Sequence, residues 1–214
     1  MQIELPNNPL SPWLSMWYSP RKTIRQIVDT NAHNQVFLLS TLIGISWALD
    51  QLSSRNAGEN LSFSFVLVLA VIGGPVIGNF LVYLMGGLLY WTGKRFGGKA
   101  PVEHLRAAYA WSWIPNIYML PFWLIQLVIF GTEMFTSTTT KLEANPSLAI
   151  MLIGFTFANV VTGLLSFIFI IISVSEVQGF SNWRAFGSIV VSLLIFLVPL
   201  FCVLAFVSGF YFGN

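Results

Sequence analysis

Residues 64–91 read SFVLVLAVIGGPVIGNFLVYLMGGLLYW, a stretch without a single Asp, Glu, Lys or Arg. A helix needs roughly 20 largely apolar residues to cross the hydrocarbon core of a bilayer, and this stretch is longer than that. The rest of the chain agrees, because 56% of its 214 residues are hydrophobic and only 8% are charged. A soluble domain carries about 25% charged residues. The sequence therefore predicts an all-α integral membrane protein.

Four more segments have the composition of membrane-spanning helices: residues 34–52, 113–130, 148–174 and 188–210. The first of these is the weakest, because its apolar run from Val36 to Leu49 stops at Asp50. By length alone it could be a re-entrant segment that does not cross. The distribution of positive charges favours a crossing. If it crosses, Arg55 and Lys141 are the only basic residues, out of ten, on the far side.

Cytoplasmic loops of membrane proteins are enriched in Lys and Arg, and without that crossing the basic residues would divide evenly between the two sides. We therefore predict a bundle of five transmembrane helices with the N-terminus in the cytoplasm and the C-terminus outside. Residues 1–33 form a cytoplasmic N-terminal segment, and residues 34–214 form the transmembrane domain.

A short amphipathic helix is expected ahead of the first span, in PRKTIRQIVDTN (Pro20–Asn31). Ile24, Ile27 and Val28 recur at helical spacing, and the basic residues fall elsewhere on the wheel. Such a helix can lie along the membrane surface with its apolar face in the lipid. It can equally well pack on the protein itself, and the sequence leaves both arrangements open.

Small and polar residues interrupt the spans. Gly74 and Gly78 form a pair that allows another helix to approach closely, within the monomer or across a homo-oligomer interface, and Pro75 between them should bend the helix. The intramembrane polar residues are Asn79, Gln126, Asn159 and Thr162. They could join helices by hydrogen bonds, or together they could line a solvated path.

The stretch GKRFGGKA (Gly93–Ala100) has the glycine and lysine spacing of a nucleotide-binding P-loop, but Ala100 stands where a Ser or Thr should hold magnesium. The segment before it ends a membrane span instead of a buried strand. We therefore expect no nucleotide and, given the small net charge of +2, no nucleic acid. The sequence shows no catalytic motif and no cluster of metal ligands, so no enzyme activity, metal or cofactor is predicted.

The basic residues of the cytoplasmic side form the candidate binding surface: Arg21, Lys22, Arg25, Lys94, Arg95, Lys99 and Arg106. Near a membrane, each such charge attracts anionic headgroups with about 1 kcal/mol. The same residues could serve only to set the topology.

Two stretches carry a family resemblance: LLYWTGKRFGGKAPVEHLRAAYAWSWIP (Leu88–Pro115) and MWYSPRKTIRQIV (Met16–Val28). They resemble the bacterial branch of the Yip1 domain family, from about Pro12 to the end of the chain. The resemblance implies five spans with the N-terminus inside, in a bacterial inner (plasma) membrane. Eukaryotic relatives are associated with Rab GTPases, but their long N-terminal region and Asp-Leu-Tyr-Gly-Pro motif are missing here, so the resemblance does not imply Rab binding.

Two functions follow from these features. The first is a non-enzymatic scaffold or adaptor that organises membrane or cytoplasmic proteins, or anionic lipids, through its basic cytoplasmic loops. The alternative is a small channel or transporter with a polar cavity among the second, third and fourth spans. A dry, tightly packed centre favours the first function, whereas a polar cavity favours the second.

Overall fold

A computed structural model describes residues 11–137 and 140–212, and these residues fold into helices and connecting loops with no strand among them. Five helical segments are long and apolar enough to cross a membrane: Val36–Ser54, Phe63–Arg95, Ile114–Phe135, Pro146–Gln178 and Asn182–Pro199. The number of spans expected from the sequence is thereby confirmed, within a few residues at most boundaries. The side of the membrane on which each terminus lies stays a prediction.

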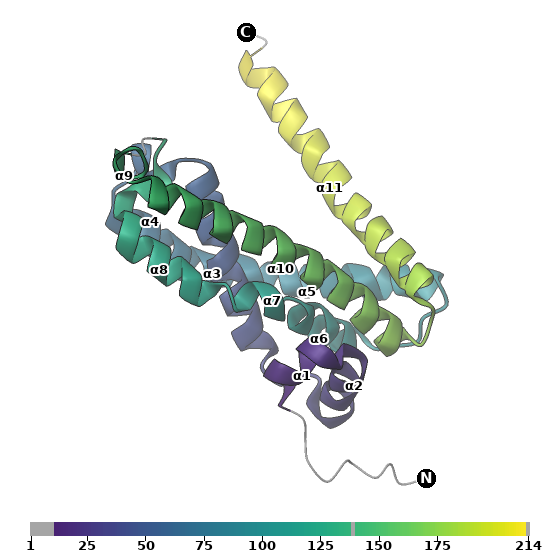
Figure 1. The fold of residues 1–214 in the computed structure, drawn as a ribbon. Coiled ribbons are helices and arrows are strands. Elements are labelled where there is room, and N and C mark those ends of the chain that lie inside the picture. The colour runs from purple at the N-terminus through teal and green to yellow at the C-terminus, as the bar shows by residue number, and fades with distance from the viewer. Residues whose placement is uncertain (1–10, 138–139, 213–214) are drawn as a thin grey trace.

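Figure 1 shows the helices in chain order. The segments before the second span are α1 (Pro12–Tyr18), α2 (Pro20–Asn31), α3 (Val36–Ser54) and the short turn η1 (Ala57–Glu59). The second span consists of α4 (Phe63–Val68), η2 (Leu69–Gly73) and α5 (Gly74–Arg95). Helix α6 (Val102–Ser112) comes next, and the third span consists of α7 (Ile114–Ile117), α8 (Leu120–Phe130) and η3 (Gly131–Phe135). The chain continues with α9 (Thr140–Ala144), α10 (Pro146–Gln178) and α11 (Asn182–Phe212).

Helix α6 lies at the centre of the structure and contacts α2, α3, α5 and α10. Leu105, Ala107, Ala108, Ala110 and Trp111 of this helix are completely buried. The three alanines allow the surrounding helices to approach closely, and the large indole of Trp111 fills space at the end of the helix. This part of the protein is therefore a packed core.

Prolines divide the second and third spans, and Pro75 in the second stands where the sequence predicts a bend. Pro75 lacks an N–H, and the chain forms a π-helical turn, η2, directly before it. Pro115 and Pro121 each stand within the first two positions of a new helix, α7 and α8 respectively. Proline is favoured there because the first N–H groups of a helix have no partner inside it. The third crossing is therefore built from short pieces.

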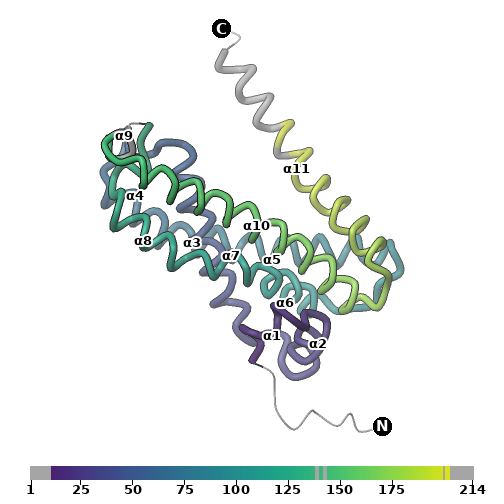
Figure 2. Tube along the Cα trace, viewed as in Figure 1, coloured from purple at the N-terminus to yellow at the C-terminus, as the bar shows by residue number. Residues whose placement is uncertain are grey.

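Helix α11 leaves the bundle at an angle to α10, as the path of the chain in Figure 2 shows. Its first turns are fixed to the end of α5 by buried hydroxyl groups. Thr92 Oγ1 lies 2.8 Å from the hydroxyls of both Ser188 and Ser192. Beyond these turns α11 diverges from the other helices, and the angle between them leaves space that the cavity described below occupies.

The segment Pro20–Asn31 forms helix α2, and the side of this helix that carries Ile24, Ile27 and Val28 lies against the protein. Ile24 is completely buried, and Ile27 and Val28 are 4% and 6% exposed. Of the two arrangements open from the sequence, the structure thus shows packing on the protein's own core. Contact of the other side of α2 with the membrane surface stays a prediction.

Candidate functional site

Helix α2 brings its basic residues to the end of α10. Arg25 Nη2 donates to the Glu176 carboxylate at 2.9 Å and to the Glu176 carbonyl oxygen at 2.8 Å. Arg21 Nη1 lies 3.3 Å from the same carboxylate, and its Nη2 donates to Asn182 Oδ1 at 2.6 Å. One carboxylate therefore holds two arginines, both about half exposed (49% and 47%).

The end of α5 carries two cations that stack on neighbouring rings. The ammonium of Lys94 lies 4.3 Å from the centre of the Tyr90 ring, and the guanidinium of Arg95 lies 4.7 Å from that of Trp91. A cation over an aromatic face is attracted by the ring's quadrupole. The rings therefore hold both charges at the level where α5 ends.

The glycines of the Gly93–Ala100 loop make room for a glutamine at the end of α10. A Cβ added at Gly93 or at Gly98 would overlap the Gln178 side chain. Gln178 Oε1 accepts from the Ala100 N–H at 3.2 Å, and its Nε2 donates to the Leu89 carbonyl oxygen at 3.4 Å. These contacts give the glycines a structural role that needs no phosphate, and sequence reasoning missed Gln178 because its partners lie far away along the chain.

These contacts join three segments at one end of the bundle, which we call the basic end. It consists of Arg21, Lys22 and Arg25 of α2, Lys94, Arg95 and Lys99 of the α5–α6 connection, and Arg184 of α11. Every one of these residues except Arg21 and Arg25 is free of ion pairs in the described part of the chain.

Arg106, which the sequence groups with these residues, lies elsewhere. Its guanidinium lies over the Tyr83 ring at 4.5 Å, and its side chain packs against Gly86 in the middle part of α5. Its Nε is buried without a hydrogen-bond partner. Arg106 is thus part of the α5–α6 contact, about three turns away from the end of α5.

The side chains of the predicted intramembrane polar residues do not bond to one another among the described residues. Asn79 bridges to α3, where its Oδ1 accepts from Ser40 at 2.7 Å and its Nδ2 donates to Thr41 at 3.3 Å. The side chains of the other three bond within their own helices: Gln126 to Phe122, Asn159 to Phe155, and Thr162 to Ala158 and Asn159. Of these four side chains, only that of Asn79 bonds to another helix among the described residues.

The glycine pair of α5 packs inside the monomer, against α3. A Cβ at Gly78 would overlap the Ser40 carbonyl and the backbone of Gly44, and a Cβ at Gly44 would overlap the Gly74 carbonyl. The backbones of α3 and α5 are therefore in direct contact at this crossing. The small-residue spacing predicted close helix packing, and the structure assigns the partner as α3.

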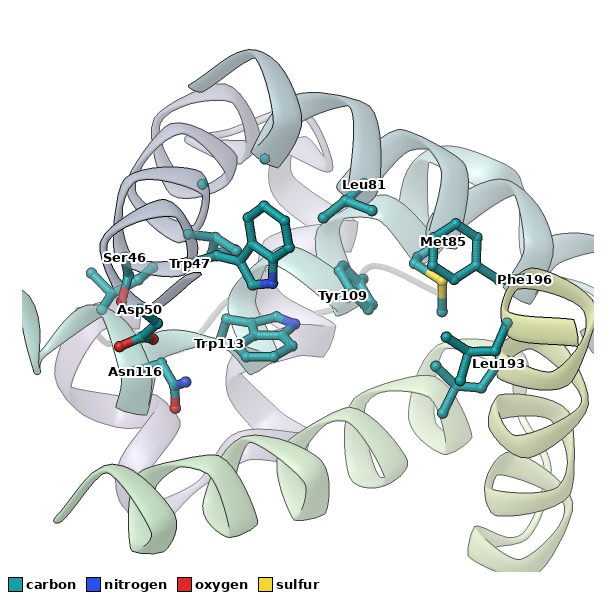
Figure 3. Close-up of a pocket in the computed structure, with 15 residues that line it drawn as sticks. Ser46, Trp47, Asp50, Leu81, Met85, Tyr109, Trp113, Asn116, Leu193 and Phe196 are labelled. Atoms are coloured by element: carbon teal, nitrogen blue, oxygen red, sulfur yellow. The ribbon is translucent and has the colours of Figure 1, made fainter. Parts of the chain in front are cut away.

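A cavity of about 220 Å³ lies next to this crossing, between α3, α5 and α11, and both Gly44 and Gly78 line it. Figure 3 shows Ser46, Asp50 and Asn116 at one end, Trp47, Trp113 and Tyr109 along it, and Met85, Leu193 and Phe196 at the far end. None of the four predicted polar residues lines this cavity. Sequence reasoning noted Asp50 only as the end of an apolar run, and missed Asn116.

Comparison with known proteins gives one match. The family model of the Yip1 domain matches residues 14–204. No curated protein and no solved structure matches the chain. The match covers all five segments long and apolar enough to span a membrane, and it includes the Gly93–Ala100 loop and helix α2. By this match over most of its length, the chain belongs to the Yip1 domain family.

Proposed function

We propose that the protein is a non-enzymatic membrane protein that acts as a scaffold or adaptor. Its basic end organises anionic lipids or protein partners. In this proposal the basic end faces the cytoplasm from a bacterial inner (plasma) membrane. The observation that carries it is the pairing of Lys94 with Tyr90 and of Arg95 with Trp91 at the end of α5. Tyr and Trp favour the headgroup level of a bilayer, which supports a position of the two charges at the level of the lipid phosphates.

The other cations extend the same surface. Lys22, Lys99 and Arg184 are exposed and form no ion pair among the described residues. Arg21 and Arg25 share the single carboxylate of Glu176, so that group retains a positive charge. Each basic residue near an anionic membrane surface contributes about 1 kcal/mol of attraction. Together these residues should bind anionic lipid strongly, and added salt should weaken the binding because it screens the charges.

The packing of the centre supports an organising role over conduction. A conducting path needs polar groups that converge, whereas Gln126, Asn159 and Thr162 bond to backbone carbonyls of their own helix. The middle of the bundle is occupied by buried α6 residues such as Trp111. A proton-coupled transporter would in addition be expected to hold an ionisable residue deep in that path, whereas Asp50, which lines the cavity beside α11, lies only one turn before the end of α3. A channel or transporter is therefore the less favoured function.

The proposal is tested by purifying the wild-type chain from native membranes in mild detergent, beside a Lys94→Gln/Arg95→Gln/Lys99→Gln variant. The wild type should retain anionic lipid, or a stoichiometric protein partner, that the variant loses. Removing positive charges can invert a membrane protein, so the topology of both forms is checked. Equal recovery of lipids and partners from two correctly oriented forms would reject the proposal.

A further inference from the structure

The cavity beside α11 has a polar end and an apolar end. Helices α3 and α5 run antiparallel and touch at Gly44 and Gly78. From this point Asp50 lies six residues along α3 in one direction, and Met85 lies seven residues along α5 in the other. At 1.5 Å per helical residue, the two ends of the cavity are therefore about 20 Å apart along the helix axes.

The polar end presents an acceptor and a donor. Asp50 lines it, and the two ion pairs of the described chain both involve Glu176, so no basic side chain neutralises this carboxyl group. Asn116 accepts a bond from Ser166 through its Oδ1 at 3.2 Å, which leaves its amide nitrogen without a protein partner in the described residues. The Trp123 indole is within reach of this carboxyl group as a donor, but a carboxylate with no cation beside it is costly inside a membrane protein, and a cationic ligand would lower that cost.

Aromatic rings stand next to the carboxyl group. Trp47, Trp113 and Tyr109 line the cavity between its two ends, as Figure 3 shows. Rings of this kind attract ammonium groups through their negative faces, and the attraction strengthens where water is excluded. A carboxylate and several aromatic faces in one cavity are thus complementary to an organic ammonium ion.

The position of the cavity indicates where such a ligand comes from. Trp47 and Leu197 line it and are 41% and 49% exposed on the surfaces of membrane-spanning helices, so the cavity opens sideways at membrane depth. Asp50 lies one turn before the end of α3, close to the headgroup level, while Met85 and Leu193 lie toward the interior of the bilayer. Like one leaflet of a bilayer, the cavity is polar at the end near the headgroups and apolar at the end toward the bilayer interior.

We propose that this cavity binds an aminophospholipid that enters sideways from the bilayer. Its ammonium group lies beside Asp50, the amide of Asn116 donates to a headgroup oxygen, and the start of one acyl chain extends toward Met85 and Leu193. At about 220 Å³ the cavity is smaller than a typical drug-sized pocket, so it holds the headgroup and part of a chain while the rest stays in the lipid.

This site is separate from the basic end in position and in charge. The basic end attracts anionic lipids at one end of the bundle, whereas Asp50 selects a cation near the opposite end of α3. Failure of one proposal therefore leaves the other intact, because each is tested with its own lipids and its own variants.

The test uses two lipids with identical dioleoyl chains and the same zero net charge: phosphatidylethanolamine, and phosphatidylcholine, whose quaternary ammonium has no N–H to donate to Asp50. Full-length protein is delipidated in mild detergent, given equal amounts of both lipids, and examined by native mass spectrometry. A charge-assisted hydrogen bond is worth enough for the wild type to retain phosphatidylethanolamine about tenfold better than phosphatidylcholine.

The matched variants are Asp50→Asn and Asp29→Asn, since Asp29 is an exposed acid on α2 outside the cavity. Asp50→Asn should abolish the preference, and Asp29→Asn should keep it. Equal retention of the two lipids by the wild type would overturn the proposal, as would a preference that survives in Asp50→Asn. The comparison of the two lipids on the wild type needs no variant. It can therefore overturn the proposal even if a variant fails to fold.

Discussion

Arg25 Nη2 bonds both the carboxylate and the backbone carbonyl oxygen of Glu176, at 2.9 and 2.8 Å, and so joins α2 to the end of α10 across 151 residues of chain. The pair is about half exposed on the arginine side. Beneath it, Ile24 is completely buried in the main core. Two different forces therefore hold α2, and their sizes can be compared.

We expect apolar burial to dominate the attachment of α2. Ile24→Ala should cost about 2–4 kcal/mol, because it removes a fully buried side chain from a packed core. Arg25→Gln should cost about 1 kcal/mol or less, because exposed ion pairs are worth little. Hydrogen exchange of the α2 amides measures both effects. A larger loss of protection in Arg25→Gln than in Ile24→Ala would contradict this ranking.

The close approach of Gln178 predicts opposite effects for two glycines of the same helix. Gly93→Ala should destabilise the protein, because its Cβ would overlap Gln178, whereas a Cβ at Gly87 meets open space. Gly87→Ala should therefore be neutral, or stabilising by about 0.5–1 kcal/mol from the better helix propensity of alanine.

Thermal unfolding in detergent compares these two variants. Adding Gln178→Ala to Gly93→Ala should restore part of the loss, because the shorter side chain leaves room for the new methyl group. If Gly93→Ala were as stable as Gly87→Ala, the packing described for this loop would be wrong.

The crossing of α3 and α5 should depend more on its glycines than on its hydrogen bonds. Asn79→Leu removes the bonds to Ser40 and Thr41, and such interhelical bonds average about 0.6 kcal/mol. Gly78→Ala forces two touching backbones apart and should cost several times more. Gly163→Ala, where a Cβ meets nothing, is the control. Unfolding in mixed micelles ranks the three, and a cost for Asn79→Leu above that for Gly78→Ala would refute the expectation.

A loop contact at the far end from the basic residues should respond to acid. The Ser137 N–H donates to Glu59 Oε1 at 3.0 Å, and hydrogen bonds from Ser137 lower the pKa of Glu59 below its usual 4.5. A lowered pKa means that the contact stabilises the folded state above pH 4.5 and is lost as the pH falls through the lower value. The Ser137 amide resonance should titrate below pH 4.5 in the wild type and not at all in Glu59→Gln. Titration at or above 4.5 would show that no such bond forms.

The sequence predicts the fold well and the contacts poorly, for physical reasons. Hydropathy acts over whole segments, so the five spans emerge even though Asp50 interrupts one of them. The charge count groups Arg21 and Arg25 with the cytoplasmic loops, but their ion pair with Glu176 joins residues some 150 positions apart, and no local pattern encodes that.

The cavity is harder still to predict. It depends on the angle at which α11 leaves the bundle and on the breaks between α6, α7 and α8, and these result from tertiary packing. Asp50 is visible in the sequence as a charge in an apolar run, and Asn116 as a polar residue beside Pro115. Nothing in their spacing shows that they line one space, whereas the amides of Asn79, Gln126 and Asn159 stand out in the sequence because they interrupt apolar runs.

The central claim, that the basic end gathers anionic lipids, is tested most directly by electron spin resonance of spin-labelled lipids in proteoliposomes. We expect a larger motionally restricted fraction for labelled phosphatidylglycerol than for labelled phosphatidylcholine. The difference should shrink with added salt and vanish in the Lys94→Gln/Arg95→Gln/Lys99→Gln variant, while Arg55→Gln, which removes an exposed charge near the opposite end, should leave it unchanged. Equal restricted fractions for the two lipids in the wild type would contradict the claim.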